Sequence, residues 1–164
     1  MTLYATRLAS MIGQLTDCLC DLLASEGAGP TCFCGVVPGE TPAWDYCGEC
    51  SGDNCGMGFI VVQTVFPSNA FPGAVEFAKC EAPLAASLQV GALRCAPTIG
   101  EGGELPDEGE MLEATLGLIS DMGAIHKAIA CCGFREYAIG AYTPLGPNGG
   151  CAGGAWDLTV GLDG

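Results

Sequence analysis

Cysteine is the residue that most limits how this chain can fold. Twelve cysteines share the 164 residues with one histidine, His126. Cysteine is therefore several times more frequent than in an ordinary domain of this size. A single histidine excludes catalytic and metal sites that need several histidines. The roles left for the cysteines are disulfides, a zinc site made of thiolates, and buried free thiols.

Length and charge set the next limits. We predict a single domain over residues 1–164. With 49% hydrophobic residues, the chain is long enough to build a core that does not depend on disulfides or metal ions for stability. Nineteen acidic residues oppose five basic ones, which gives a formal net charge of -14. This balance disfavours nucleic-acid binding by phosphate neutralisation, and also docking on an anionic membrane. The charge is compatible with an acidic surface that repels DNA.

The cysteines conflict with the apparent lack of an export signal. Asp17 and Asp21 interrupt the apolar stretch that follows Arg7, so no signal peptide is expected. No run of about 18 apolar residues is present, so no membrane span is expected either. Disulfides, however, normally form outside the cytosol. A protein assembled in the host cytoplasm and released later, such as a virion component, resolves the conflict.

Apolar spacing predicts two amphipathic helices, over residues 4–23 and about 107–131. Thr2 is a suitable cap for the first helix, and Pro106 with Asp107 suits the start of the second. We interpret the first stripe as core, with a groove for a partner helix as the less favoured alternative. The stripe of the second helix is Met111, Leu112, Thr115, Leu118, Ile119, Met122, Ile125 and Ile129.

Alternating and β-branched segments predict four strands, over residues 31–37, 58–66, 81–95 and 156–162. A short extended segment is expected at 138–139. Loops are expected at 38–57, 98–107 and 142–155, where glycine, proline or acidic residues accumulate. The predicted class is α/β (α+β), a mostly antiparallel or mixed sheet with two packed helices in the order α-β-β-β-α-β.

Five cysteines cluster in the first third of the chain. Disulfides are the favoured interpretation, and a bridge from Cys34 to Cys47 would close a hairpin-like loop. A zinc site of Cys32, Cys34, Cys47 and Cys50 is the alternative, and free thiols are a third. The candidate disulfide cysteines are Cys32, Cys34, Cys47, Cys50 and Cys55.

No constellation predicts catalysis. His126 falls late in the second helix, where interaction with the helix dipole explains it. Glu108 and Glu110 are better explained as solvated charge than as an acid-base pair. The segment 146–150 lacks the lysine and the following helix of a phosphate-binding loop. We therefore expect neither an enzyme nor a cofactor.

Four stretches resemble the tail terminators of long-tailed (siphovirus) actinobacterial phages. Together they span nearly the whole chain beyond residue 30, and none is a catalytic motif. They are Trp44-Asp-Tyr-Cys47 followed by Cys50 and Cys55, Phe66-Pro-Ser-Asn-Ala-Phe-Pro72, the segment from Leu88 to Pro97, and the segment from Tyr142 to Trp156.

The resemblance implies a virion protein that forms a ring, normally a hexamer, on the head-proximal end of the tail tube. Such a ring stops polymerisation of the major tail tube protein and joins the tail to the head-tail stopper or connector. DNA passes through its lumen without specific binding. The implied fold is α/β, with two helices packed on a sheet. Six copies would carry about -84, six times -14, and an acidic lumen would repel DNA.

Two loops are candidates for contacts in such a ring. The acidic linker offers Gly100, Glu101, Glu104 and Asp107, and the later loop offers Tyr142, Pro147 and Asn148. A different neck ring, such as a head-tail stopper or adaptor, is the leading alternative function. A cysteine-rich zinc-binding module is a less favoured one, and a small enzyme is the least favoured.

Overall fold

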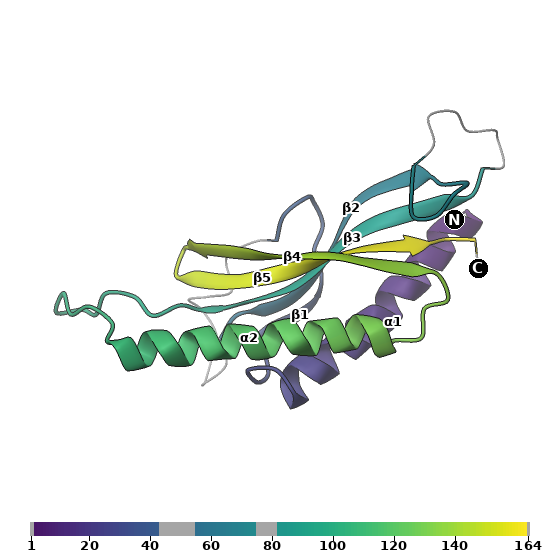
Figure 1. Cartoon of the computed structure of the whole chain (residues 1–164). Coiled ribbons are helices and arrows are strands. Elements are labelled where there is room, and N and C mark those ends of the chain that lie inside the picture. Colours follow the sequence, from purple (N-terminus) through teal and green to yellow (C-terminus); the bar gives the residue numbers. More distant parts are fainter. Residues whose placement is uncertain (1, 43–54, 75–81, 164) are drawn as a thin grey trace.

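The computed structural model describes residues 2–42, 55–74 and 82–163 of the chain. Within these residues, helices α1 (Leu3–Ser25) and α2 (Glu108–Cys131) lie on the same side of a five-stranded mixed sheet (Figure 1). The predicted α+β class, with two helices packed on a mixed sheet, is confirmed.

The strands are β1 (Phe33–Val36), β2 (Met57–Pro67), β3 (Leu84–Cys95), β4 (Tyr137–Asn148) and β5 (Cys151–Gly161). Their order across the sheet is β1-β2-β3-β5-β4. The short β1 runs parallel to β2, and the other neighbours are antiparallel. The element order is therefore α-β-β-β-α-β-β, one strand more than predicted.

The additional strand corrects the predicted loop at 142–155. Most of that segment belongs to β4 and β5, which pair as a hairpin. The turn is made by Gly149 and Gly150, whose positive φ angles of 58° and 77° favour glycine. Pro144 and Pro147 are tolerated because β4 is an edge strand, which needs ladder hydrogen bonds on one side only. The glycines and prolines of this segment are typical of a loop, and for this reason the sequence does not predict the strand.

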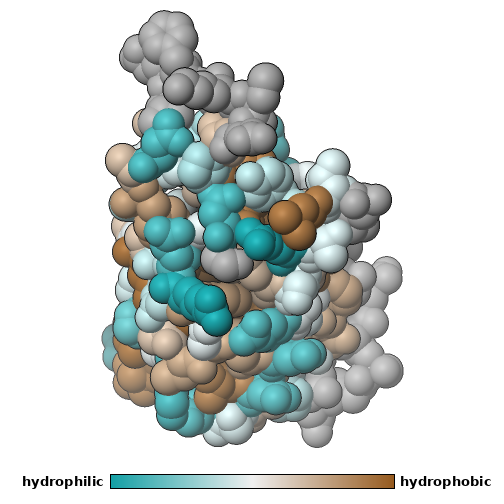
Figure 2. All heavy atoms as spheres, turned by 90° about the vertical axis from the view of Figure 1, so that its right-hand side faces the viewer, coloured by the Kyte–Doolittle hydropathy of each residue, from teal (hydrophilic) through white to brown (hydrophobic). Residues whose placement is uncertain are grey.

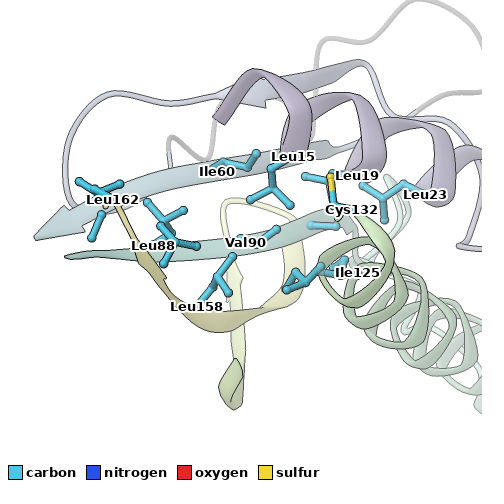
Figure 3. Packing of buried hydrophobic residues seen from close by; sticks show 14 residues of the cluster. Leu15, Leu19, Leu23, Ile60, Leu88, Val90, Ile125, Cys132, Leu158 and Leu162 are labelled. Atoms are coloured by element: carbon cyan, nitrogen blue, oxygen red, sulfur yellow. The ribbon is translucent and has the colours of Figure 1, made fainter. Parts of the chain in front are cut away.

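The main core lies between the helices and the sheet. Leu15, Leu19 and Leu23 from α1 are fully buried, at the four-residue spacing that places them on one helix face. Figure 3 shows these leucines beside buried side chains from the sheet, from α2 and from the segments that follow α2 and β5; the labelled partners are Ile60, Leu88, Val90, Ile125, Cys132, Leu158 and Leu162. The interpretation of the first stripe as core is thereby confirmed.

Both helices begin where the sequence predicts. The Thr2 hydroxyl accepts a hydrogen bond from the Ala5 N–H at the start of α1. At α2, the Asp107 carboxylate accepts from the Glu110 N–H, and the Glu110 carboxylate accepts from the Asp107 N–H. This reciprocal pair is a capping box, which satisfies backbone donors that the helix itself leaves unpaired.

A buried ion pair fixes α2 against the sheet. Arg94 in β3 donates from Nε and from a terminal nitrogen to the two carboxylate oxygens of Asp121 in α2, at 2.7 and 2.9 Å. Asp121 also accepts from the Ala28 N–H at 2.9 Å. The remaining Arg94 donors reach the carbonyls of Gly29 and Pro30. The pair thus holds β3, α2 and the segment after α1 together.

Replacing Arg94 with methionine tests this pair. Arg94→Met leaves the Asp121 carboxylate buried without its counter-charge, so we expect the free energy of unfolding to fall by about 3–5 kcal/mol in urea denaturation. The matched control is Lys127→Met, because Lys127 pairs with Glu26 at the surface. Surface pairs contribute little, so this control should unfold almost as the parent does. Equal losses in the two variants would contradict the account.

Candidate functional site

The predicted acidic linker forms a projecting arm, defined here as residues 96–107. It joins β3 to α2 and contains no helix or strand. Its four candidate contact residues, Gly100, Glu101, Glu104 and Asp107, are all exposed. The Gly100 N–H donates to the Glu104 carbonyl at 2.9 Å, which closes a small loop at the tip. Asp107 caps α2, so its carboxylate already has a structural role.

The second set of predicted contact residues lies in β4 rather than in a loop. Pro147 and Asn148 are exposed at the hairpin end of the strand. The neighbouring Gly150 carbonyl accepts a hydrogen bond of 2.7 Å from the Ala96 N–H, at the base of the arm. The structure therefore brings the hairpin end and the arm together. A role of either in binding stays a prediction.

Tyr142 is held in place by Trp156. The two ring centroids are 5.4 Å apart, and Trp156 also contacts His126 at 5.1 Å. The Trp156 indole N–H donates to the Met122 carbonyl in α2. Burial raises the pKa of the Tyr142 phenol above its usual value of 10, and the negative charge of Asp121 raises it further. Trp156 therefore links α2 to the β4–β5 hairpin, and Tyr142 packs against Trp156.

The amino-terminal half of α2 exposes an apolar surface. Only the later part of the predicted stripe packs in the core, with Ile125 and Ile129 fully buried. Four earlier side chains are each more than half exposed; they are Met111, Leu112, Leu116 and Ile119, and we call them the apolar stripe. They recur at helical spacing and so lie on one face. Three of them, Met111, Leu112 and Ile119, belong to the stripe that the spacing predicts for this helix.

A pocket of about 320 Å³ lies near the opposite end of α2. Its lining combines the apolar side chains Met11, Phe134 and Leu162 with three charged ones, Arg7, Arg135 and Glu136. Arg7 donates to the Leu162 carbonyl at 2.8 Å. Figure 2 looks at the end of the molecule that carries both termini, where hydrophilic and hydrophobic side chains lie side by side.

The sequence gives no sign of this pocket. Arg7 and Arg135 are separated by most of the chain, and neither belongs to a charge run. The five basic residues are scattered along the sequence, yet two of them line one pocket. Only the packing of α1 beside the end of α2 brings them together.

The cysteines join secondary-structure elements. Cys18 in α1 is bonded to Cys132 after α2, and Cys20 in α1 is bonded to Cys34 in β1. A third bond links Cys55, just before β2, to Cys95 at the end of β3. The predicted disulfide roles of Cys34 and Cys55 are confirmed, but their partners lie outside the predicted cluster.

The specific bridge from Cys34 to Cys47 is wrong, because Cys34 is bonded to Cys20 in α1. Cys32 is also disulfide-bonded. Cys47 and Cys50 lie outside the described residues. Cys131 is an exposed free thiol.

The disulfides also bear on the alternative zinc site. A cysteine in a disulfide carries no thiolate for a metal, so Cys32 and Cys34 are not ligands in this structure. Among the residues that the structure describes, no group of three or more His, Cys, Asp or Glu side chains is arranged to hold a metal ion.

Comparison of the chain with protein-family models, curated proteins and solved structures finds no match. No helix in the described ranges is both long and apolar enough to cross a membrane. Its charge, its exposed apolar stripe and its pocket are the features of the molecule that bear on function.

Removing the bridge between the helices tests the role of the disulfides. Cys18 and Cys132 are 114 residues apart, and a crosslink over so long a loop strongly limits the unfolded chain. We expect Cys18→Ala with Cys132→Ala to lower the free energy of unfolding by about 3–5 kcal/mol in urea denaturation. Cys131→Ala, at the adjacent exposed thiol, is the control and should change little. An unchanged double variant would show that the bridge adds no stability.

Proposed function

We propose that this chain is a structural protein that assembles with copies of itself. The apolar stripe of α2 is the observation that carries the proposal. Soluble monomers rarely expose contiguous apolar side chains, and such surfaces typically mark contacts between proteins. Exposed acids, Glu108, Glu110 and Glu113, share this half of the helix. Their negative charges disfavour the binding of nucleic acid or of an anionic membrane. Another protein is therefore the partner that suits the stripe.

A second copy is the occupant that we propose for the stripe. The stripe directly follows the acidic arm along the chain, and both lie at one end of an elongated molecule (Figure 1). The opposite end carries the pocket, which is lined by two arginines and by apolar side chains that are buried or partly buried. Because the two ends carry different surfaces, head-to-tail contacts between copies are favoured. Such contacts close into a ring when the rotation from one copy to the next brings the last copy back to the first.

More particularly, we propose a ring that acts as a tail terminator of a long-tailed phage. The resemblance in four stretches of sequence supports this role. The arrangement of two helices on one side of a mixed sheet agrees with the fold that the resemblance implies. The net charge of -14 suits a channel through which DNA slides without binding. Disulfides suit a particle that leaves the reducing cytoplasm at lysis. The proposed partners are the major tail tube protein and the head-tail stopper.

Electron microscopy of the purified chain tests the proposal. We expect rings with a central opening, and in reconstituted mixtures we expect these rings at one end of tubes formed by the tail tube protein. Tubes should then stop growing when the chain is added. A chain that forms no rings and leaves tube length unchanged would contradict the proposed function.

Charged substitutions in the apolar stripe provide a sharper test. Leu112→Asp with Leu116→Asp puts two carboxylates where we expect a dry contact, so rings should be lost and the sedimentation coefficient should become that of a monomer. The fold should persist, because both leucines are more than half exposed. Ala130→Asp is the control; Ala130 is exposed on the same helix face, five turns beyond Leu112. Rings of normal stability in the double variant would exclude the stripe from the assembly.

A further inference from the structure

Two of the four described basic residues have no acidic partner. Arg94 pairs with Asp121 and Lys127 pairs with Glu26, whereas Arg7 and Arg135 form no ion pair within the described ranges. Both of these arginines line the pocket near the termini. With Glu136, the lining carries two positive charges and one negative charge, in a chain whose net charge is -14. The pocket is therefore an exception to the acidic character of the molecule.

The pocket also has an apolar part. Met11 and Phe134 are partly buried against the main core and line the pocket beside the arginines. The Arg7 guanidinium is oriented by its hydrogen bond to the Leu162 carbonyl. Arg135 is exposed. A ligand that fits this lining combines an apolar side chain with carboxylates next to it.

The arm carries that combination. Leu105 is 76% exposed, which is unusual for a leucine. It directly follows Glu104, and Glu101 lies at the same loop tip; both acids are exposed and neither forms an ion pair within the described ranges. The hydrogen bond between Gly100 and Glu104 gives the tip a defined shape, which lowers the entropy lost on binding.

We propose that the pocket binds the segment Glu101–Leu105 of a second copy of this chain. Leu105 packs against Met11 and Phe134, while Glu101 and Glu104 face Arg7 and Arg135. The inference rests on the proposed function in one respect, that copies of the chain contact one another.

A chain cannot fill its own pocket in this structure. The arm precedes α2 and the residues that line the pocket at 133–136 follow it, so the 24-residue helix separates them by about 36 Å. The contact is therefore head to tail. Such a contact uses two different surfaces of each copy and generates either a closed ring or an open filament.

Exchanging the charges between the two surfaces tests the contact. Glu104→Arg and Arg135→Glu each place like charges together, so each should weaken self-association by about tenfold or more in sedimentation equilibrium. A chain with both changes regains opposite charges across the contact and should associate nearly as the parent does. Arg135 is preferred to Arg7, because Arg7 also donates to the Leu162 carbonyl of the fold.

Glu40→Arg is the control, since it makes the same change of charge at an exposed site that belongs neither to the arm nor to the pocket lining. It should leave association unchanged, and circular dichroism should report the parent fold for every variant. Failure of the doubly changed chain to recover, or normal association of either single variant, overturns the contact.

The outcomes separate this contact from the ring itself. If the parent forms rings that are insensitive to these charges, the contact is wrong and the proposed function stands. If the parent forms open filaments that depend on these charges, the contact is supported and the ring is contradicted. A parent that is monomeric at every concentration tested contradicts both.

Discussion

The buried ion pair of Arg94 and Asp121 determines how the two layers of this fold are joined. Asp121 lies near the middle of α2, and its two carboxylate oxygens are occupied by Arg94 from β3 and by the Ala28 N–H after α1. A buried carboxylate is costly unless such partners are in place, so this arrangement tolerates little displacement of the helix. The disulfide of Cys18 with Cys132 then fixes the end of α2 against α1.

These attachments divide α2 into two unlike halves. Beyond Asp121, the helix buries Ile125 and Ile129 in the main core. Before Asp121, it exposes the apolar stripe and continues from the acidic arm. The molecule thus carries an acidic and apolar surface at one end and a pocket with two arginines at the other. A polarised molecule of this kind is suited to repeated head-to-tail contacts, which is the property that a ring requires.

The sequence predicts the elements of this fold better than it predicts their partners. Both helices, the central strands and the caps at Thr2 and Asp107 follow from local patterns. The strand β4 does not, because edge position makes its prolines and glycines tolerable only once β5 is beside it. Periodicity also places Leu112 and Ile125 on helix stripes without revealing that one is exposed and the other buried. The pocket depends on residues as distant as Arg7 and Arg135, whose proximity only tertiary packing creates.

Native mass spectrometry shows most directly whether the chain assembles into a ring. The measurement counts the copies in the particle, and repeating it with reductant shows whether disulfides are needed for the assembly. We predict six copies, about 100 kDa from a chain of 16.6 kDa. Twelve copies would instead favour a different neck ring. A monomer at all concentrations would contradict the account.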